Sequence, residues 1–136
     1  MLEDVERWPE WWRGVARVTR LDPGRELGEG CCYHVAWRSR IPYELEFDFT
    51  VRRVEEPRLM VGDAIGDLTG WGRWRLLEQD GVTAVLYEWN VRTTKAWMNA
   101  VGPIAAPIFR WNHDRVMRWG GEGLAHHLGA RLIAAS

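Results

Sequence analysis

The chain has 136 residues, a length typical of one domain, and we expect a single domain over residues 1–136. Lysine and arginine number 18 against 19 aspartate and glutamate, so the formal net charge is −1 and the basic excess of nucleic-acid-binding proteins is lacking. No apolar run approaches the roughly 20 residues of a membrane span, and the acidic, aromatic start is unlike a signal peptide. The composition favours a cytoplasmic protein with neither nucleic acid nor membrane as a partner.

Residues 3–12 predict a short helix that Pro9 interrupts or reshapes, because Trp8, Trp11 and Trp12 recur at helical spacing. About six antiparallel strands are predicted next from alternating apolar and polar residues. Their ranges are 15–21, 31–40, 43–54, 58–67, 69–79 and 82–95. The Asp80-Gly81 turn between the last two predicts a hairpin. Gly70 and Gly72 indicate a bend or the close approach of something bulky.

The hydrophobic period then changes, and a helix is predicted from Trp97 to about Leu132, bent early by Gly102, Pro103 and Pro107. Its apolar stripe is Phe109, Val116, Met117, Gly120, Leu124 and Leu128. Strands that precede one long amphipathic helix predict an α+β fold. We expect a curved antiparallel sheet wrapped around this helix, with aromatic rings around the space between them.

Aromatic rings are unusually abundant, with ten Trp, three Tyr and three Phe. They form either a bulky core or the lining of a cavity. The two cysteines, Cys31 and Cys32, are adjacent and are interpreted as reduced thiols within a strand. Neighbouring residues lie about 3.8 Å apart, which is too close for an unstrained disulfide. No metal and no cofactor are expected, since a vicinal pair supplies too few ligands for zinc.

Three stretches resemble the START-like superfamily, also called SRPBCC, and within it the bacterial polyketide cyclase/dehydrase-type proteins. They are VERWPEWWRGVARVTRLDPG, TGWGRWRLLEQDGVTAVLYEWNVRTT and FRWNHDRVMRWGGEGLAHHL. The resemblance spans roughly residues 3–132 and implies a helix-grip fold with a deep cavity for a hydrophobic or aromatic small molecule. Some relatives resemble aromatase/cyclases and others are lipid carriers, so the resemblance implies no single chemistry.

Members of this family usually begin with an additional strand and helix before the VERWPEWW-like segment, and in this sequence both are apparently missing. The sheet is then expected to expose a long unpaired edge. A homodimer through that edge is the simplest way to cover it.

His113 is the most distinctive candidate for a functional polar group. It stands four residues from both Phe109 and Met117, which predicts that its imidazole faces the cavity. It is assigned either as an acid/base or ligand-orienting group or as a hydrogen-bonded core histidine. Asn112 lies near the edge of the same stripe and presents its amide either to a ligand or to the backbone.

The remaining predicted ligand-binding residues are assigned to the cavity wall by strand alternation or by the helix stripe. Core packing is the competing interpretation for each ring of the strands. They are Tyr33, Trp37, Phe47, Phe49, Trp74, Tyr87, Trp89, Phe109 and Met117.

Two functions follow from these patterns and from the resemblance. The first is the binding of a hydrophobic, aromatic or polyketide-like small molecule between the sheet and the C-terminal helix. The alternative is a polyketide cyclase/dehydrase-type enzyme that uses His113 as its acid/base, because cyclisation needs mainly a shaped dry pocket and one proton-transfer group. A structural or regulatory dimer that uses the sheet edge is a third class. Nucleophilic catalysis is not supported, because the sequence has no GxSxG motif.

Overall fold

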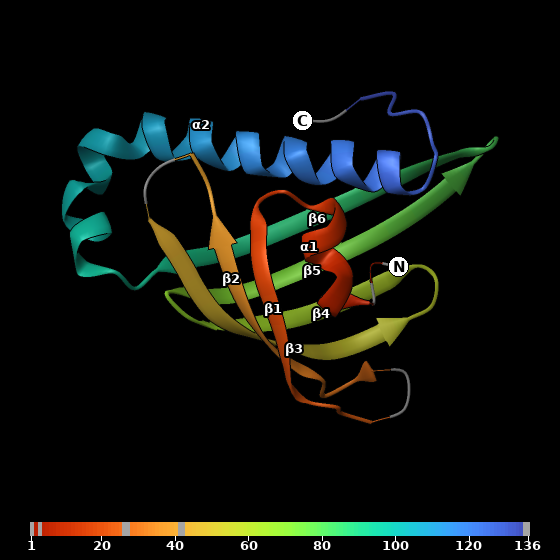
Figure 1. The fold of residues 1–136 in the computed structure, drawn as a ribbon, viewed down its shortest axis with the longest axis horizontal. Helices are drawn as coiled ribbons and strands as arrows, with labels where there is room; N and C mark the ends of the chain where they lie inside the picture. Colours follow the sequence, from red (N-terminus) through yellow and green to blue (C-terminus); the bar gives the residue numbers. More distant parts are fainter. Residues whose placement is uncertain (1, 3, 26–27, 41–42, 135–136) are drawn as a thin grey trace.

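A computed structural model describes residues 2, 4–25, 28–40 and 43–134 (Figure 1). The chain begins with a 3-10 turn, η1 (Val5–Arg7), and the short helix α1 (Trp8–Trp11). Six strands follow: β1 (Val15–Asp22), β2 (Cys32–Arg38), β3 (Glu44–Glu55), β4 (Leu59–Gly66), β5 (Leu68–Gln79) and β6 (Val82–Thr93). The long helix α2 (Ala96–His127) comes last.

The six strands form one sheet in which each strand pairs antiparallel with the next, in the order β1-β2-β3-β4-β5-β6. Helix α2 passes over one face of this sheet, and α1 lies against both β1 and α2 (Figure 1). This arrangement confirms the predicted α+β helix-grip fold. Within the described residues, no helix combines the length and the apolarity that crossing a membrane requires.

The hairpin predicted at Asp80-Gly81 is confirmed. Gln79 pairs with Val82, so only two residues connect β5 to β6. Both have positive φ, 52° at Asp80 and 75° at Gly81. This combination is typical of the tight turn whose twist matches that of the flanking strands. Gly72 confirms the predicted close approach, because a Cβ there would overlap the ring of Trp89.

The inner and outer faces of the sheet follow the predicted alternation through β2 and most of β3. A β-bulge between Val51 and Arg53 then shifts the register of β3 against β4. Because a bulge inserts one residue, Val54 turns inward and is buried while Arg53 remains exposed. The outer face carries ion pairs between neighbouring strands: His34–Asp48, Arg38–Glu44, Arg52–Asp63 and Arg73–Glu88. A further pair, Arg17–Glu46, reaches across β2 from β1 to β3.

Helix α2 differs from the prediction at its C-terminal end. It ends at His127 rather than near Leu132. Gly129 has a φ of 62°, a left-handed conformation that commonly terminates helices. Leu128, predicted on the apolar stripe, therefore lies beyond the last turn and is 59% exposed. The helix continues through Pro103 and Pro107 as one element, and Figure 1 shows it curving near its start.

Trp12 occupies the middle of the space between sheet and helix. Its side chain is completely buried, and its indole Nε1 donates a 2.8 Å hydrogen bond to the Val116 carbonyl of α2. The ring centroids of five neighbours lie 5.5–5.9 Å from the ring centroid of Trp12. These neighbours are Trp8, Trp11, Trp37, Trp74 and Tyr87. Trp12 thus joins α1, the sheet and α2 in one aromatic core.

Two glycines of α2 allow this close packing. A Cβ at position 120 would lie 2.8 Å from the indole of Trp12, and one at position 123 would overlap the Trp11 carbonyl oxygen. The sequence RWGGEG, which interrupts the pattern of large residues in the helix, is therefore the contact surface for α1.

Asp67 connects the sheet to the start of α2. Its Oδ2 accepts hydrogen bonds of 3.0 Å from both the Glu46 amide and the Lys95 ammonium group, and its carbonyl accepts one from the Thr94 amide. Partial burial raises the pKa of Asp67. The hydrogen bond from the Glu46 amide and the contact with Lys95 together lower this pKa by more than burial raises it, so the net pKa lies below its usual range.

We expect Asp67→Asn to lower the free energy of unfolding by about 1 kcal/mol at neutral pH, because it removes one charge-assisted contact that is partly exposed. A lowered folded-state pKa contributes stability above the unfolded-state pKa of about 3.9, and this is lost as the pH falls through the folded-state value. Urea unfolding of the unsubstituted protein and of Asp67→Asn, at neutral and at strongly acidic pH, tests this pH dependence. Asp114→Asn, on an exposed helix face, is the control. An equal difference at both pH values would contradict the ionic role of Asp67.

Candidate functional site

The predicted aromatic wall exists on the inner face of the sheet. Trp89 lies at its centre, with ring centroids 5.5 Å from Trp37, 5.7 Å from Phe47, 6.3 Å from Phe49 and 5.6 Å from Tyr87. Trp74 stacks on Tyr87 at 3.8 Å. The structure therefore brings together six of the predicted ring residues, which come from β2, β3, β5 and β6.

Tyr33 lies apart from this group. It is buried, and within the described part of the chain it makes no ring-ring contact; the Arg20 guanidinium lies 5.7 Å above its ring. Burial, followed by a hydrogen bond with Cys31, raises the pKa of Tyr33 to about 12. A direct role for Tyr33 beside the other rings is therefore not supported by its position.

The rings of the wall pack against one another. Trp37, Phe47, Phe49 and Trp74 are all buried in the core, and Trp12 contacts Trp37 and Trp74 from the side of α1. In this conformation the expected open, ring-lined cavity is occupied by side chains. The part of these rings in ligand binding stays a prediction.

Four of the predicted residues retain some accessible surface. Tyr87 and Trp89 on β6 and Phe109 and Met117 on α2 are only partly buried. Burial raises the pKa of Tyr87 well above its usual value, so its phenol stays neutral under physiological conditions. These four side chains are the part of the wall that a small molecule can reach with the least rearrangement.

Several polar atoms in this interior lack hydrogen-bond partners among the described residues. The indole nitrogens of Trp37 and Trp74 and the Oδ1 atom of Asn112 are buried and unpaired. A buried polar group without a partner costs about 1–3 kcal/mol. Such groups are therefore uncommon in native structures and call for a physical explanation.

Asn112, predicted near the edge of the apolar stripe, lies on the buried line of α2 and is the one buried polar residue described in this helix. Burial raises the pKa of Tyr43, and a hydrogen bond between its hydroxyl and the Asn112 amide offsets part of this rise. The Tyr43 ring in turn meets Trp97 edge-on at 5.6 Å. One end of the Asn112 amide is thus held by Tyr43, next to the start of β3, while Oδ1 stays available.

The predicted direction of His113 is wrong. Its side chain is 52% exposed, and its Nδ1 lies 3.6 Å from Oδ1 of the neighbouring Asp114. The buried line of α2 runs through Asn112, Val116, Gly120 and Leu124. Each helical residue is rotated about 100° from the one before, so His113 lies one step around from this line. Contact of His113 with a ligand in the interior is therefore not supported.

The first half of α2 is weakly anchored. Of the described residues from Ala96 to Trp111, only Met98 is buried. Several large apolar side chains in this half are exposed, including Ile104 at 89% and Ile108 at 57%. Few buried contacts mean a low free-energy cost of local opening. This half of the helix is therefore the part of the fold most easily displaced from the sheet.

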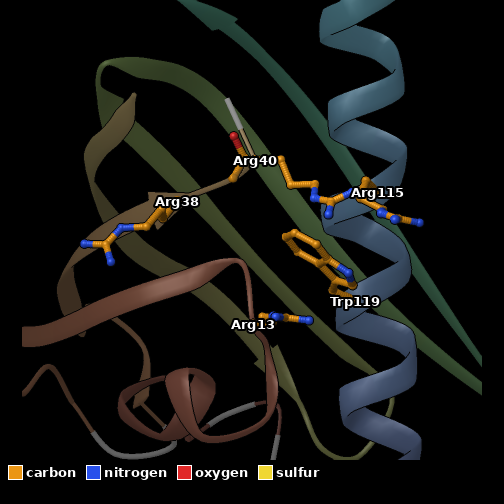
Figure 2. A pocket seen from close by; sticks show the side chains of 6 residues that line it. Arg13, Arg38, Arg40, Arg115 and Trp119 are labelled. Atoms are coloured by element: carbon orange, nitrogen blue, oxygen red, sulfur yellow. The ribbon is translucent and has the colours of Figure 1, made fainter. Parts of the chain in front are cut away.

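Two surface pockets flank the aromatic core. The first has a volume of about 320 Å³ and is lined by Arg13, Arg38, Ser39, Arg40, Arg115 and Trp119 (Figure 2). The second, of about 470 Å³, lies where α1 meets the end of α2 and is lined by Asp4, Arg7, Trp11, His127 and Leu128. None of the residues of the first pocket is predicted as a site residue from the sequence. They come from three separate segments of the chain, and no local motif indicates them.

Three carboxylates of the sheet, Asp48, Asp63 and Glu88, lie on its outer face and are paired. Asp48 contacts His34 at 2.7 Å, and Asp63 contacts Arg52 at 2.6 Å. Hydrogen bonds from Arg73 lower the pKa of Glu88. None of them is a candidate acid/base in the interior. Among the residues that the structure describes, no group of three or more His, Cys, Asp or Glu side chains is arranged to hold a metal ion.

Comparison with known proteins agrees with the fold. The crystal structure of TTHA0849 from Thermus thermophilus superimposes with a TM-score of 0.68 at 13% sequence identity, covering 92% of this chain and 86% of that one. At this identity the similarity concerns the fold alone. No curated protein sequence matches. The family model described as polyketide cyclase / dehydrase and lipid transport matches residues 1–118. The chain therefore belongs to the polyketide cyclase/dehydrase and lipid transport family.

Proposed function

We propose that this protein binds a hydrophobic, aromatic small molecule between the sheet and α2. One observation carries the proposal: the indole N–H groups of Trp37 and Trp74, within the aromatic core, and the Asn112 Oδ1 atom of α2 are buried without partners in the described part of the chain. The indoles donate hydrogen bonds and Oδ1 accepts one. A ring system that carries a carbonyl and a hydroxyl group, as polyketide-like molecules do, satisfies both kinds of atom.

Binding requires a change in conformation, because the rings of the wall are in contact with one another. The first half of α2 supplies this change, since Met98 is the only buried residue described before Asn112 in this helix. Displacing it gives a molecule access to Tyr87, Trp89 and Phe109, which are already partly exposed. The ligand then replaces ring-ring contacts with its own apolar surface, and the first half of α2 closes over it, so the bound state is favoured over the opened one.

Titration with 6-acetyl-2-naphthol, which carries one carbonyl and one hydroxyl group on a ring pair, tests the proposal. We expect saturable binding of one molecule per chain. Quenching of tryptophan fluorescence is the signal that reports this binding. Trp37→Phe keeps an aromatic ring but removes the N–H donor, and is expected to weaken binding about 3- to 10-fold, the usual worth of a neutral hydrogen bond. Trp97→Phe is the matched control, because Trp97 is 48% exposed on α2.

The result against the proposal is either no saturable binding or equal losses in Trp37→Phe and Trp97→Phe. A third variant, Ile104→Lys, separates interior binding from adsorption on the apolar surface of α2, since Ile104 is 89% exposed. Loss of binding in Ile104→Lys with full binding in Trp37→Phe would place the probe on the helix surface. His113→Ala is expected to leave the affinity unchanged within about twofold, because His113 faces solvent.

The alternative function, a polyketide cyclase/dehydrase-type enzyme, required an inward-facing His113 as its acid/base. Its exposed position gives this alternative no support, and we do not propose it.

The predicted homodimer through the sheet edge stays a prediction. Within the described residues, β6 pairs only with β5, so its other edge is open. Val82, Val85 and Leu86 of this strand are exposed at 48%, 37% and 42%. Open edges of this kind pair readily with another strand. A native mass measurement that finds only the 15.8 kDa chain at micromolar concentration would contradict the dimer.

A further inference from the structure

The arginine-lined pocket, formed by Arg13, Arg38, Ser39, Arg40, Arg115 and Trp119, concentrates positive charge in a chain whose formal net charge is −1. The fold assembles this charge, because the residues come from the turn before β1, from the end of β2 and the residues after it, and from α2. The volume of about 320 Å³ falls in the range of small-molecule sites.

Three of the four guanidinium groups have no ion-pair partner in the described part of the chain, where no carboxylate lies within ion-pair distance of Arg13, Arg40 or Arg115. Arg38 differs, since it contacts Glu44 at 3.1 Å and its guanidinium points away from α2 (Figure 2). The Nε atom of Arg115 is buried, and no described residue accepts a hydrogen bond from it. Like charges gathered around one pocket repel one another, and a buried guanidinium donor without an acceptor is costly.

Trp119 gives the same pocket an aromatic wall. The Arg13 guanidinium lies 5.3 Å from the centre of its ring, a cation–π contact. Figure 2 shows Arg13 and Arg40 approaching Trp119 from two sides, with Arg115 next to it on α2. The pocket therefore offers charged donors and a flat apolar surface to one molecule.

We propose that this pocket binds the oxyanion group, a carboxylate or a phosphate, of a small aromatic acid. Guanidinium groups match such oxyanions because their parallel N–H donors make two hydrogen bonds to two oxygens. The bound anion supplies the missing acceptor of Arg115 and offsets the repulsion among Arg13, Arg40 and Arg115. This site requires no movement of α2, so it does not depend on the interior site proposed above.

Calorimetric titration with three probes of one ring system tests this site: 2-naphthoate, 2-naphthyl phosphate and the neutral 2-naphthylmethanol. We expect at least one anion to bind about 10-fold or more tightly than the alcohol, and the tighter anion identifies the oxyanion. Arg40→Gln and Arg115→Gln are each expected to weaken anion binding about 10-fold, as for a lost charged hydrogen bond. Added salt weakens binding of the anions and leaves the alcohol unaffected.

Arg110→Gln is the matched control, since it removes the same charge from α2 at an exposed residue outside the pocket. Arg40 is exposed, so its replacement leaves the core intact even where Arg115→Gln lowers the melting temperature. Equal affinity for the anions and the alcohol overturns the proposal. It is also overturned if Arg40→Gln weakens anion binding no more than Arg110→Gln does.

Discussion

Replacing Trp12 with alanine is expected to lower the free energy of unfolding by about 3–5 kcal/mol, which is the usual cost of removing a fully buried large aromatic side chain. Trp12 has no exposed surface and meets five other rings, and its indole also donates to the Val116 carbonyl. The substitution therefore removes a buried hydrogen bond as well as the central contact among α1, the sheet and α2.

Chemical denaturation measures the free energy of unfolding of Trp12→Ala and, as a control, of Trp97→Ala. Trp97 is 48% exposed at the start of α2, so its loss is expected to cost about 1 kcal/mol or less. Total stabilities of small proteins are about 5–15 kcal/mol, so Trp12→Ala is expected to be close to the limit of folding. Equal losses in the two variants would show that Trp12 is not central to the core.

Gly123→Ala is expected to be the most damaging of the small substitutions. In an ordinary helix this change stabilises by about 1 kcal/mol, because alanine has the higher helix propensity. Here the new Cβ would overlap the Trp11 carbonyl oxygen, and backbone atoms cannot rotate away as a side chain can. Overpacking of this kind costs about 1–3 kcal/mol or more, so the sign of the effect reverses.

The matched control is Gly102→Ala in the same helix, where a Cβ meets nothing within 4 Å outside its chain neighbours. It is expected to leave the melting temperature nearly unchanged, because the gain in helix propensity is opposed by crowding against the ring of Pro103, while Gly123→Ala lowers it. If both glycines respond alike, then the contact between α1 and α2 does not depend on Gly123.

The strands could be predicted from the sequence because their period of two is a local property. Alternation through residues 43–51 assigns Phe47, Phe49 and Val51 to one face, and the structure buries all three. The bulge after Val51 could not be predicted, because it depends on pairing with β4. For the same reason, the burial of Val54 could not be predicted.

The orientation of the helix was harder to predict. Spacing alone shows that Phe109, His113 and Met117 share a line along α2, but it does not show how far the helix is rotated about its axis. That rotation is set by contacts with α1 through Gly120 and Gly123, and it turns Asn112 inward and His113 outward.

The arginine-lined pocket could not be predicted from the sequence either. Its charged residues lie far apart along the chain, and only the folded chain brings Arg13 and Arg40 to Arg115. No spacing rule connects such positions, because their proximity depends on how α2 crosses the sheet.

Hydrogen exchange of the α2 amides tests the interior binding site most directly, with and without saturating 6-acetyl-2-naphthol. Without the probe, amides from Trp97 to Trp111 are expected to exchange faster than those around Val116 and Leu124, which are buried. With the probe bound, exchange in the first half of α2 is expected to slow, while the β3–β4 turn is unchanged. Bound probe that leaves exchange in α2 unchanged would contradict a site between this helix and the sheet.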